Sequence, residues 1–119
     1  MKVGLKIRNK EGSNKPTRYY SKKQEKQVAK ELGGRTTKNS GATPFSKGDV
    51  FTDDYLVECK TKTSPSSQIT IKKEWLEKLN AESLFMGKNG SVLVFDFGEN
   101  TKKYCIIDLD TFKDLISEE

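Results

Sequence analysis

Two acidic residues and a lysine are spaced so that one β-hairpin could bring them together. Asp49 precedes a short apolar segment, and Glu58 and Lys60 lie in the strand-like segment that follows. If Asp53-Asp54 forms a two-residue turn, Asp49 stands opposite Glu58, and directly opposed residues hold their Cβ atoms about 4.5–5.5 Å apart. Lys60 lies two residues after Glu58, so it projects from the same face of the strand. A three-residue turn would shift this pairing.

Such a cluster predicts a metal site. Two like charges held side by side are destabilising unless a cation lies between them, and Mg²⁺ takes one or two carboxylates together with substrate phosphate and water. We therefore expect Mg²⁺ between Asp49 and Glu58, with Mn²⁺ able to substitute, and Lys60 beside it to stabilise developing negative charge. The alternative is structural, because a Glu-x-Lys pattern is also typical of a solvated strand face with an ion pair.

A third carboxylate is expected near this cluster. In a helix over residues 21–32, Glu25 shares one stripe with Val28, Ala29 and Leu32, and this stripe should pack against the sheet. A carboxylate directed inward is costly without a partner, so Glu25 becomes a candidate site residue. The alternative places Glu25 near the helix start, half exposed and favoured by the helix dipole.

The composition excludes several classes of enzyme. The chain of 119 residues has no histidine, so mechanisms that need an imidazole base, including Ser-His-Asp triads, are excluded. Cys59 and Cys105 are far apart in the sequence, and they predict neither a zinc site nor a disulfide framework. Any hydrolysis would depend on carboxylates, lysine and a metal.

Charge is distributed unevenly along the chain, whose net charge is +5. Residues 1–26 carry nine Lys/Arg and two acids, whereas residues 91–119 carry seven Asp/Glu and three Lys. A strongly positive end suits contact with nucleic acid or an anionic surface, although a flexible soluble arm has the same composition. No apolar run predicts a membrane span and no signal-peptide pattern is present, so we expect a cytoplasmic protein.

Hydrophobic periodicity predicts an α/β fold in which helices flank a small mixed β-sheet. We expect one domain over residues 1–119, with a basic N-terminal arm over residues 1–20. The expected elements, in chain order, are a strand at 2–8, a helix at 21–32 capped by Ser21, a short strand at 36–38, strands at 50–51 and 55–59, a helix at 72–86, strands at 91–97 and 103–107, and a last helix capped by Asp110.

The clustered residues resemble the motifs of the PD-(D/E)XK nuclease superfamily. Gly48-Asp49-Val50 is similar to its Pro-Asp motif, and Val57-Glu58-Cys59-Lys60 is similar to its hydrophobic-(D/E)-x-K strand. Glu25 occupies the place of the glutamate on the first helix, and the resemblance covers about residues 20–97. Within the superfamily, the short chain, the basic N-terminus and Ser40-Gly41-Ala42 are most similar to Holliday junction resolvases of the archaeal and phage type. The departure is Gly48, which stands where the family has proline.

This resemblance implies a restriction-endonuclease-like αβββαβ core and a Mg²⁺-dependent homodimer that nicks opposed strands of branched DNA. It implies that Asp49 and Glu58 bind the metal, with the backbone carbonyl of Cys59 as a further possible ligand. Lys60 would assist the attacking water and Glu25 would complete the metal shell. A bacterial cell or a phage-infected host is the setting that the resemblance suggests.

Candidate contacts to DNA phosphates come from basic and hydroxyl side chains around the motifs. They are Arg18, Lys22, Lys23, Ser40, Lys62, Lys72 and Lys73. Trp75 is expected in the core or at a dimer interface rather than as a platform for base stacking. Three hypotheses follow: a junction-resolving endodeoxyribonuclease, another nuclease of the same fold that acts in restriction or repair, and a non-catalytic basic nucleic-acid-binding protein whose acidic cluster is structural.

Overall fold

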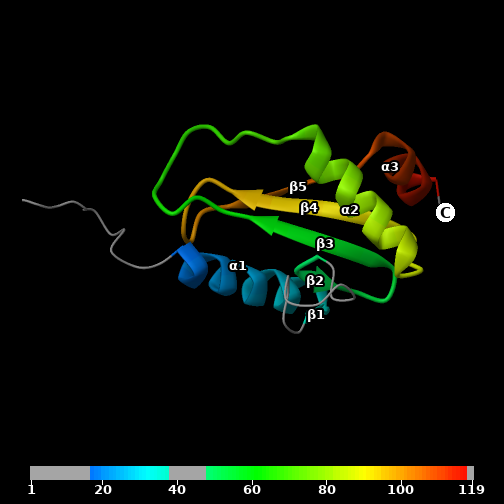
Figure 1. The fold of residues 1–119 in the computed structure, drawn as a ribbon, viewed down its shortest axis with the longest axis horizontal. Helices are drawn as coiled ribbons and strands as arrows, with labels where there is room; N and C mark the ends of the chain where they lie inside the picture. The colour runs from blue at the N-terminus through cyan, green and yellow to red at the C-terminus, as the bar shows by residue number, and fades with distance from the viewer. Residues whose placement is uncertain (1–16, 38–47, 118–119) are drawn as a thin grey trace, which may run out of the picture.

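The computed structural model describes residues 17–37 and 48–117, in which three helices and five strands follow one another (Figure 1). The elements are α1 (Thr17–Leu32), β1 (Arg35–Thr36), β2 (Val50–Phe51), β3 (Tyr55–Lys60), α2 (Lys73–Phe85), β4 (Gly90–Asp96), β5 (Lys103–Ile106) and α3 (Leu109–Ile116).

The five strands form one mixed sheet in the order β1-β2-β3-β4-β5. Neighbouring strands are antiparallel except β3 and β4, which are parallel and are connected through α2. A parallel pair needs such a crossover, because the chain must return to the end of the sheet from which the first strand began. The expected small mixed α/β fold is therefore confirmed, and the C-terminal ends of β3 and β4 lie at the same end of the sheet.

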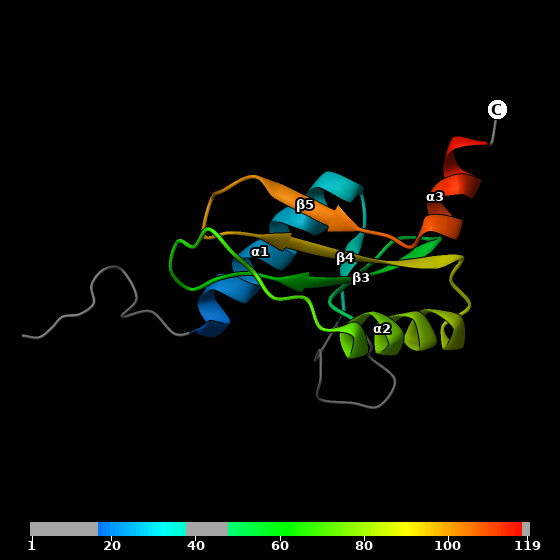
Figure 2. The same ribbon diagram turned by 90° about the horizontal axis from the view of Figure 1, so that it is seen from above.

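Helices α1 and α2 cover opposite faces of the sheet (Figure 2). The side chains of β3 alternate between the two faces of the sheet, because successive side chains of a strand point to opposite sides. Val57 and Cys59 pack with residues of α1, whereas Leu56 packs with residues of α2. Glu58 and Lys60 follow Leu56 in this alternation, and both line a cavity against α2. The candidate site thus lies between β3 and the start of α2.

Some expected boundaries are wrong. Helix α1 begins at Thr17, four residues before Ser21, and the expected strand at 2–8 lies outside the described residues. Leu32, expected to pack against the sheet, is 49% exposed; it is the last residue of the helix, and Gly33, with a φ of +67°, turns the chain into β1. The last helix is capped by Asp108, whose side chain accepts a hydrogen bond from the Thr111 backbone N–H, and not by Asp110.

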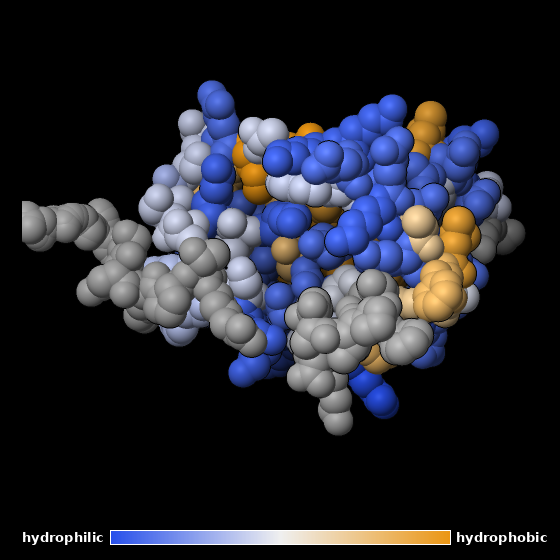
Figure 3. Space-filling view, in the orientation of Figure 1, coloured by the Kyte–Doolittle hydropathy of each residue, from blue (hydrophilic) through white to orange (hydrophobic). Residues whose placement is uncertain are grey.

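Large apolar side chains are exposed at the end of the molecule that carries the C-terminus of α2 and helix α3. Figure 3 shows a mainly hydrophilic face with apolar atoms gathered toward this end. The exposed residues are Leu84 and Phe85 of α2 and Leu109, Phe112, Leu115 and Ile116 of α3. None of the described helices has the length and apolar content needed to cross a membrane.

Candidate functional site

The hairpin between β2 and β3 has the expected two-residue turn. The Thr52 N–H donates to the Tyr55 carbonyl at 2.9 Å, and Val50 is paired with Val57. The regular pairing ends at Val50, and the N–H of Asp49, the preceding residue, donates to the Val57 carbonyl at 2.9 Å. The pKa of the Glu58 carboxyl is raised, first by burial and then by the negative charge of Asp49. The negative charge of Asp49 therefore acts on the Glu58 carboxyl.

The carboxylate of Asp49 is held in place by backbone contacts. Its Oδ2 accepts a hydrogen bond of 2.8 Å from the Cys59 N–H, and its own N–H donates to the Val57 carbonyl at 2.9 Å. On the other side, the Thr37 N–H donates to the Asp49 carbonyl at 3.0 Å. Asp49 is therefore tied to both β3 and the end of β1, which limits the freedom of its carboxylate.

Gly48 explains why the chain departs from the Pro-Asp pattern. Its φ is +71°, whereas the proline ring fixes φ near about −65°. A Cβ atom at this position would lie 2.7 Å from Cδ1 of Leu56, which is completely buried. The Gly48 carbonyl also accepts a hydrogen bond of 3.0 Å from Oγ1 of Thr37. Only glycine suits both the conformation and the close approach, so here glycine positions the aspartate.

We expect Gly48→Ala to lower the free energy of unfolding by about 3 kcal/mol, because it adds a steric clash with a buried side chain to the cost of a left-handed conformation. The matched control is Gly87→Ala. Gly87 has a φ of +75°, and no atom lies within 4 Å of the position that a Cβ would occupy there, so this control measures the conformational cost alone, about 1 kcal/mol. Urea unfolding measures both variants, and equal losses would contradict the packing argument.

Lys60 is fixed at its backbone and at its ammonium group. Its carbonyl accepts a hydrogen bond of 2.7 Å from Nε2 of Gln24 on α1. Its Nζ lies 3.4 Å from Oε2 of Glu58 and 4.2 Å from the centroid of the Trp75 ring, and Nζ of Lys72 lies 5.8 Å from the same ring. These groups border a cavity of about 410 Å³ between β3 and α2, which is lined by Glu58, Lys60, Glu74, Trp75, Lys78, Leu79 and Glu82.

Four carboxylates from four segments surround Cys59. The pKa of its thiol is raised far above the ordinary range, first by burial and then by the charges of Asp49, Glu25, Glu58 and Asp96. A buried thiol in this environment stays protonated and is a poor nucleophile. Cys59 therefore contributes to the site through its backbone rather than through its sulfur.

Glu25 is buried, with 8% of its surface exposed, so the alternative of a half-exposed position near the helix start is wrong. Glu25 belongs to α1, whereas Glu58 lines the cavity on the α2 side of the sheet. Within residues 17–37 and 48–117, no three His, Cys, Asp or Glu side chains are arranged to hold a metal ion. The structure relates Asp49 to β3 in two ways: its charge acts on Glu58, and its Oδ2 accepts a hydrogen bond from the Cys59 N–H.

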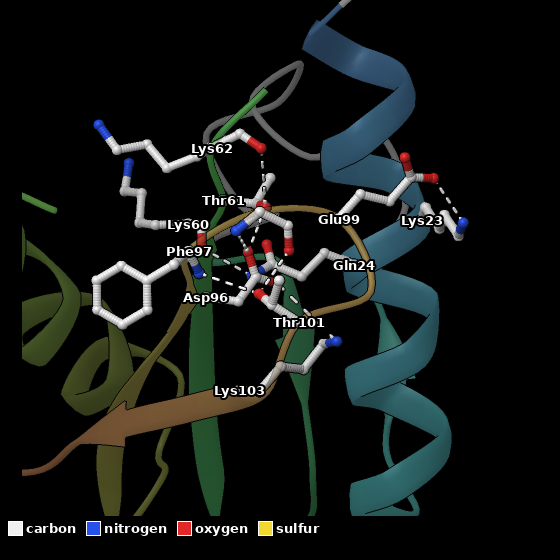
Figure 4. Close-up of polar contacts among 11 residues, drawn as sticks. Lys23, Gln24, Lys60, Thr61, Lys62, Asp96, Phe97, Glu99, Thr101 and Lys103 are labelled. Atoms are coloured by element: carbon white, nitrogen blue, oxygen red, sulfur yellow. Dashed lines mark hydrogen bonds and ion pairs between the residues drawn. The ribbon is translucent and has the colours of Figure 1, made fainter. Parts of the chain in front are cut away.

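A buried polar network at the ends of β3 and β4 was not predicted from the sequence (Figure 4). Its centre is Asp96, of which 2% is exposed. The carboxylate accepts hydrogen bonds from Oγ1 of Thr61, from Nε2 of Gln24 at 3.2 Å and from the Gly98 N–H at 3.2 Å, and Nζ of Lys103 lies 3.9 Å away. The sequence signal that could have indicated this network is Asp96 itself, the single acidic residue in the mainly apolar segment 91–97. A buried charge requires polar partners.

The candidate DNA contacts are spread over both faces of the sheet. Lys22 and Lys23 are on α1, and Nζ of Lys23 is paired with Glu99 at 2.6 Å. Figure 4 shows Lys62 extending away from the Asp96 network, as Lys60 does. Lys72 and Lys73 are exposed at the start of α2, where Lys73 has an exposed ion pair with Glu77.

Two of the candidate contacts cannot be placed. Ser40 and the side chain of Arg18 lie outside the described residues, and so does most of the basic arm 1–20. Of the basic side chains that are described, Lys60 and Lys72 are brought together on Trp75, whereas those of α1 are held on the other side of the sheet.

Comparisons with known proteins give no match to a family model, to a curated protein or to a solved structure.

Proposed function

We propose that this chain is a metal-dependent endodeoxyribonuclease of the PD-(D/E)XK type that acts on branched DNA, such as Holliday junctions, by phosphodiester hydrolysis. The observation that carries the proposal is the position of Asp49 at the end of the β2–β3 hairpin. Its Oδ2 accepts a hydrogen bond from the Cys59 N–H and its charge acts on Glu58, whose carboxylate lies 3.4 Å from Nζ of Lys60. The order of elements supports a restriction-endonuclease-like core, because a helix and three antiparallel strands are followed by a crossover helix and a parallel strand.

The donor atoms suit a hard divalent cation. Two carboxylates and one backbone carbonyl are the oxygen ligands from which Mg²⁺ sites in phosphate enzymes are built, with water and substrate phosphate as the rest. The effect of Asp49 on Glu58 supports this, since the pKa of Glu58 is raised first by burial and then by the negative charge of Asp49, which a cation would balance. Bound Mg²⁺ would lower the pKa of water and withdraw charge from the phosphate. Glu25, buried on α1, remains the candidate for the third carboxylate of the metal shell, and its charge acts on Cys59 together with those of Asp49 and Glu58.

The chain's own residues have distinct roles in this proposal. The Cys59 N–H keeps the Asp49 carboxylate fixed, so that it needs little reorganisation on binding. Glu58 provides the second carboxylate. The ammonium group of Lys60 orients the attacking water or stabilises the negative charge that develops on the phosphate oxygens. Exposed lysines at the start of α2 could contact the DNA backbone beside the site.

A homodimer is part of the proposal, and the exposed apolar residues of α2 and α3 support it. Exposed apolar patches mark interaction surfaces in many proteins. These residues lie at the end of the molecule away from the C-terminal ends of β3 and β4 (Figure 1), on two helices that Figure 2 shows apart from each other. A second copy bound there would leave both candidate sites open to DNA.

The test is a cleavage assay on a labelled synthetic four-way junction and on a linear duplex of the same sequence, with Mg²⁺ or with EDTA. We expect Mg²⁺-dependent nicks in the junction, and a loss of about a hundredfold or more in Lys60→Ala. The control is Lys113→Ala, which removes an exposed lysine of α3 at the other end of the molecule. This control should cleave as the wild type does.

The same assay separates the other hypotheses. Equal cleavage of junction and duplex would favour another nuclease of this fold, of the restriction or repair type. A protein that binds DNA but cleaves neither substrate, and in which Asp49→Asn changes nothing, would be a basic nucleic-acid-binding protein with a structural acidic cluster. That result would reject the nuclease proposal.

A further inference from the structure

Trp75 contacts the lysine of the candidate site. It lies in the first turn of α2, where its side chain is half-buried against the core formed by Leu56, Leu79 and Leu93. The Nζ atom of Lys60 is 4.2 Å from the centre of its ring. This distance is well inside the range of about 6 Å in which an ammonium group is attracted to an aromatic face.

Lys60 therefore has two described partners for its ammonium group, and they differ in how a metal would affect them. The first is the Glu58 carboxylate at 3.4 Å, and the second is the Trp75 ring. A carboxylate that binds a divalent cation has less negative potential left for an ammonium group, and the cation itself repels that group. The ring is not a ligand for a hard cation, which takes oxygen atoms. It can keep its contact with Lys60 when Glu58 cannot.

We propose that Trp75 is a positioning residue that holds the Lys60 ammonium group beside the metal ligands; this inference rests on the proposed nuclease function. The ring acts through Lys60 and not on the substrate. A role as a platform for base stacking is less favourable, because Lys72 also lies over the ring, with its Nζ 5.8 Å from the centroid. A stacked base would compete with two ammonium groups for the same aromatic surface.

The kinetic test compares two variants. Trp75→Leu keeps an apolar side chain but removes the aromatic ring, whereas Trp75→Phe keeps an apolar side chain and an aromatic ring. Under saturating Mg²⁺, we expect Trp75→Leu to slow single-turnover cleavage of the junction about tenfold, because a cation–π contact of this kind is lost. The Kd for the junction should stay within about twofold, because the variant keeps every lysine and arginine, the side chains that supply the phosphate contacts. Trp75→Phe should restore most of the rate.

Three kinetic outcomes would overturn the proposal. A weaker Kd with an unchanged rate would indicate base stacking. Equal losses of rate in Trp75→Leu and Trp75→Phe, accompanied by equal losses of thermal stability, would indicate a role in core packing. A wild-type rate in Trp75→Leu would show that the ring is not needed.

A second readout does not depend on activity. The Lys60 ε-methylene protons lie close to the ring of the only tryptophan in the chain, so their NMR signal should be shifted upfield by the ring current. We expect the upfield shift to be lost in Trp75→Leu and to persist when wild-type protein is saturated with Mg²⁺. Loss of the shift on Mg²⁺ addition would mean that the ammonium group leaves the ring, which would overturn the proposal.

The two proposals fail in different ways. If neither Mg²⁺ nor Mn²⁺ binds and no substrate is cleaved, the proposed function is rejected, and this role for Trp75 is rejected with it. If Mg²⁺-dependent cleavage is found but the upfield shift is absent from the wild-type protein, the nuclease stands and Trp75 does not position its lysine.

Discussion

Replacing Glu58 with glutamine is expected to reduce cleavage by about a thousandfold or more, because the substitution removes one of the two carboxylates that can share a cation. The variant keeps the shape of the side chain, so the hairpin and the cavity against α2 should be preserved. Binding to the junction, measured by a gel-shift or anisotropy titration in Ca²⁺ or EDTA, should stay within about threefold of the wild type, because lysines and arginines supply the phosphate contacts.

The same substitution is expected to stabilise the metal-free protein at neutral pH. The pKa of Glu58 is raised in the folded state, chiefly by burial and then by Asp49, and Lys60 only partly offsets this. Because its pKa is higher in the folded state than in the unfolded state, this group contributes most to the free energy of unfolding at low pH, where glutamate is protonated in both states. The contribution is lost as the pH rises through the raised pKa. At neutral pH the charge therefore opposes folding, and glutamine removes that cost.

Urea unfolding of the metal-free protein at several pH values measures the effect. We expect the free energy of unfolding of Glu58→Gln to exceed that of the wild type by about 1 kcal/mol at pH 7. The difference should vanish at a pH below the range in which glutamate ordinarily titrates. The control is Glu31→Gln, an exposed glutamate of α1, which should change the stability by no more than about 0.5 kcal/mol. A Glu58→Gln variant that is less stable than the wild type at pH 7 would mean that the Lys60 ion pair outweighs burial.

The hairpin could be predicted because its information is local. Val50-Phe51 and the segment 55–60 are strand-forming, and Asp53-Asp54 between them fits a two-residue turn, so the register followed from counting residues. The register also carries Asp49 to the segment 57–59 of β3, where its N–H donates to the Val57 carbonyl and its carboxylate accepts from the Cys59 N–H. The turn and the strand-forming residues of this hairpin thus determine how the segment that carries Asp49 meets the segment that carries Glu58 and Lys60.

The features that could not be predicted depend on contacts between distant segments. The requirement for glycine at position 48 arises from Leu56, which approaches only because β2 and β3 pair. The contact of Trp75 with Lys60 depends on where α2 crosses the sheet, and sequence periodicity places Trp75 on the inner face of the helix without saying which strand residue it meets. The position of Glu58 has the same origin, since the alternation of side chains in β3 places it with Leu56 on the face that α2 covers.

Asp96 is the clearest case of a long-range polar feature, and it links four elements of the fold. Its carboxylate is reached by Gln24 of α1, by Thr61 just after β3, by Gly98 beyond β4 and by Lys103 of β5. The same Nε2 atom of Gln24 also donates to the Lys60 carbonyl, while the buried Oε1 atom of Gln24 has no hydrogen-bond partner within the described residues. The Gln24 amide is therefore oriented by Asp96 and Lys60 together, and the network fixes the backbone from which the Lys60 side chain extends.

Replacing Asp96 with alanine should consequently lower the free energy of unfolding by about 3–5 kcal/mol, as expected when one partner of a buried charged network is removed. The substitution removes the hydrogen bonds that the Thr61 hydroxyl and Nε2 of Gln24 donate to Asp96. It also leaves Lys103 without its buried counter-charge. Asp114→Ala is the matched control, because Asp114 is exposed on α3, and it should change the stability by no more than about 0.5 kcal/mol.

A double-mutant cycle with Thr61→Val separates the network from simple loss of volume. If the Thr61 hydroxyl contributes through Asp96, the combined loss in Asp96→Ala/Thr61→Val should be smaller than the sum of the single losses by about 1 kcal/mol. Additive losses would mean that the two side chains act independently. A decrease of less than about 1 kcal/mol in the free energy of unfolding of Asp96→Ala would contradict the argument from burial. A side chain that is 2% exposed can be removed at so small a cost only if its former partners form hydrogen bonds with water instead.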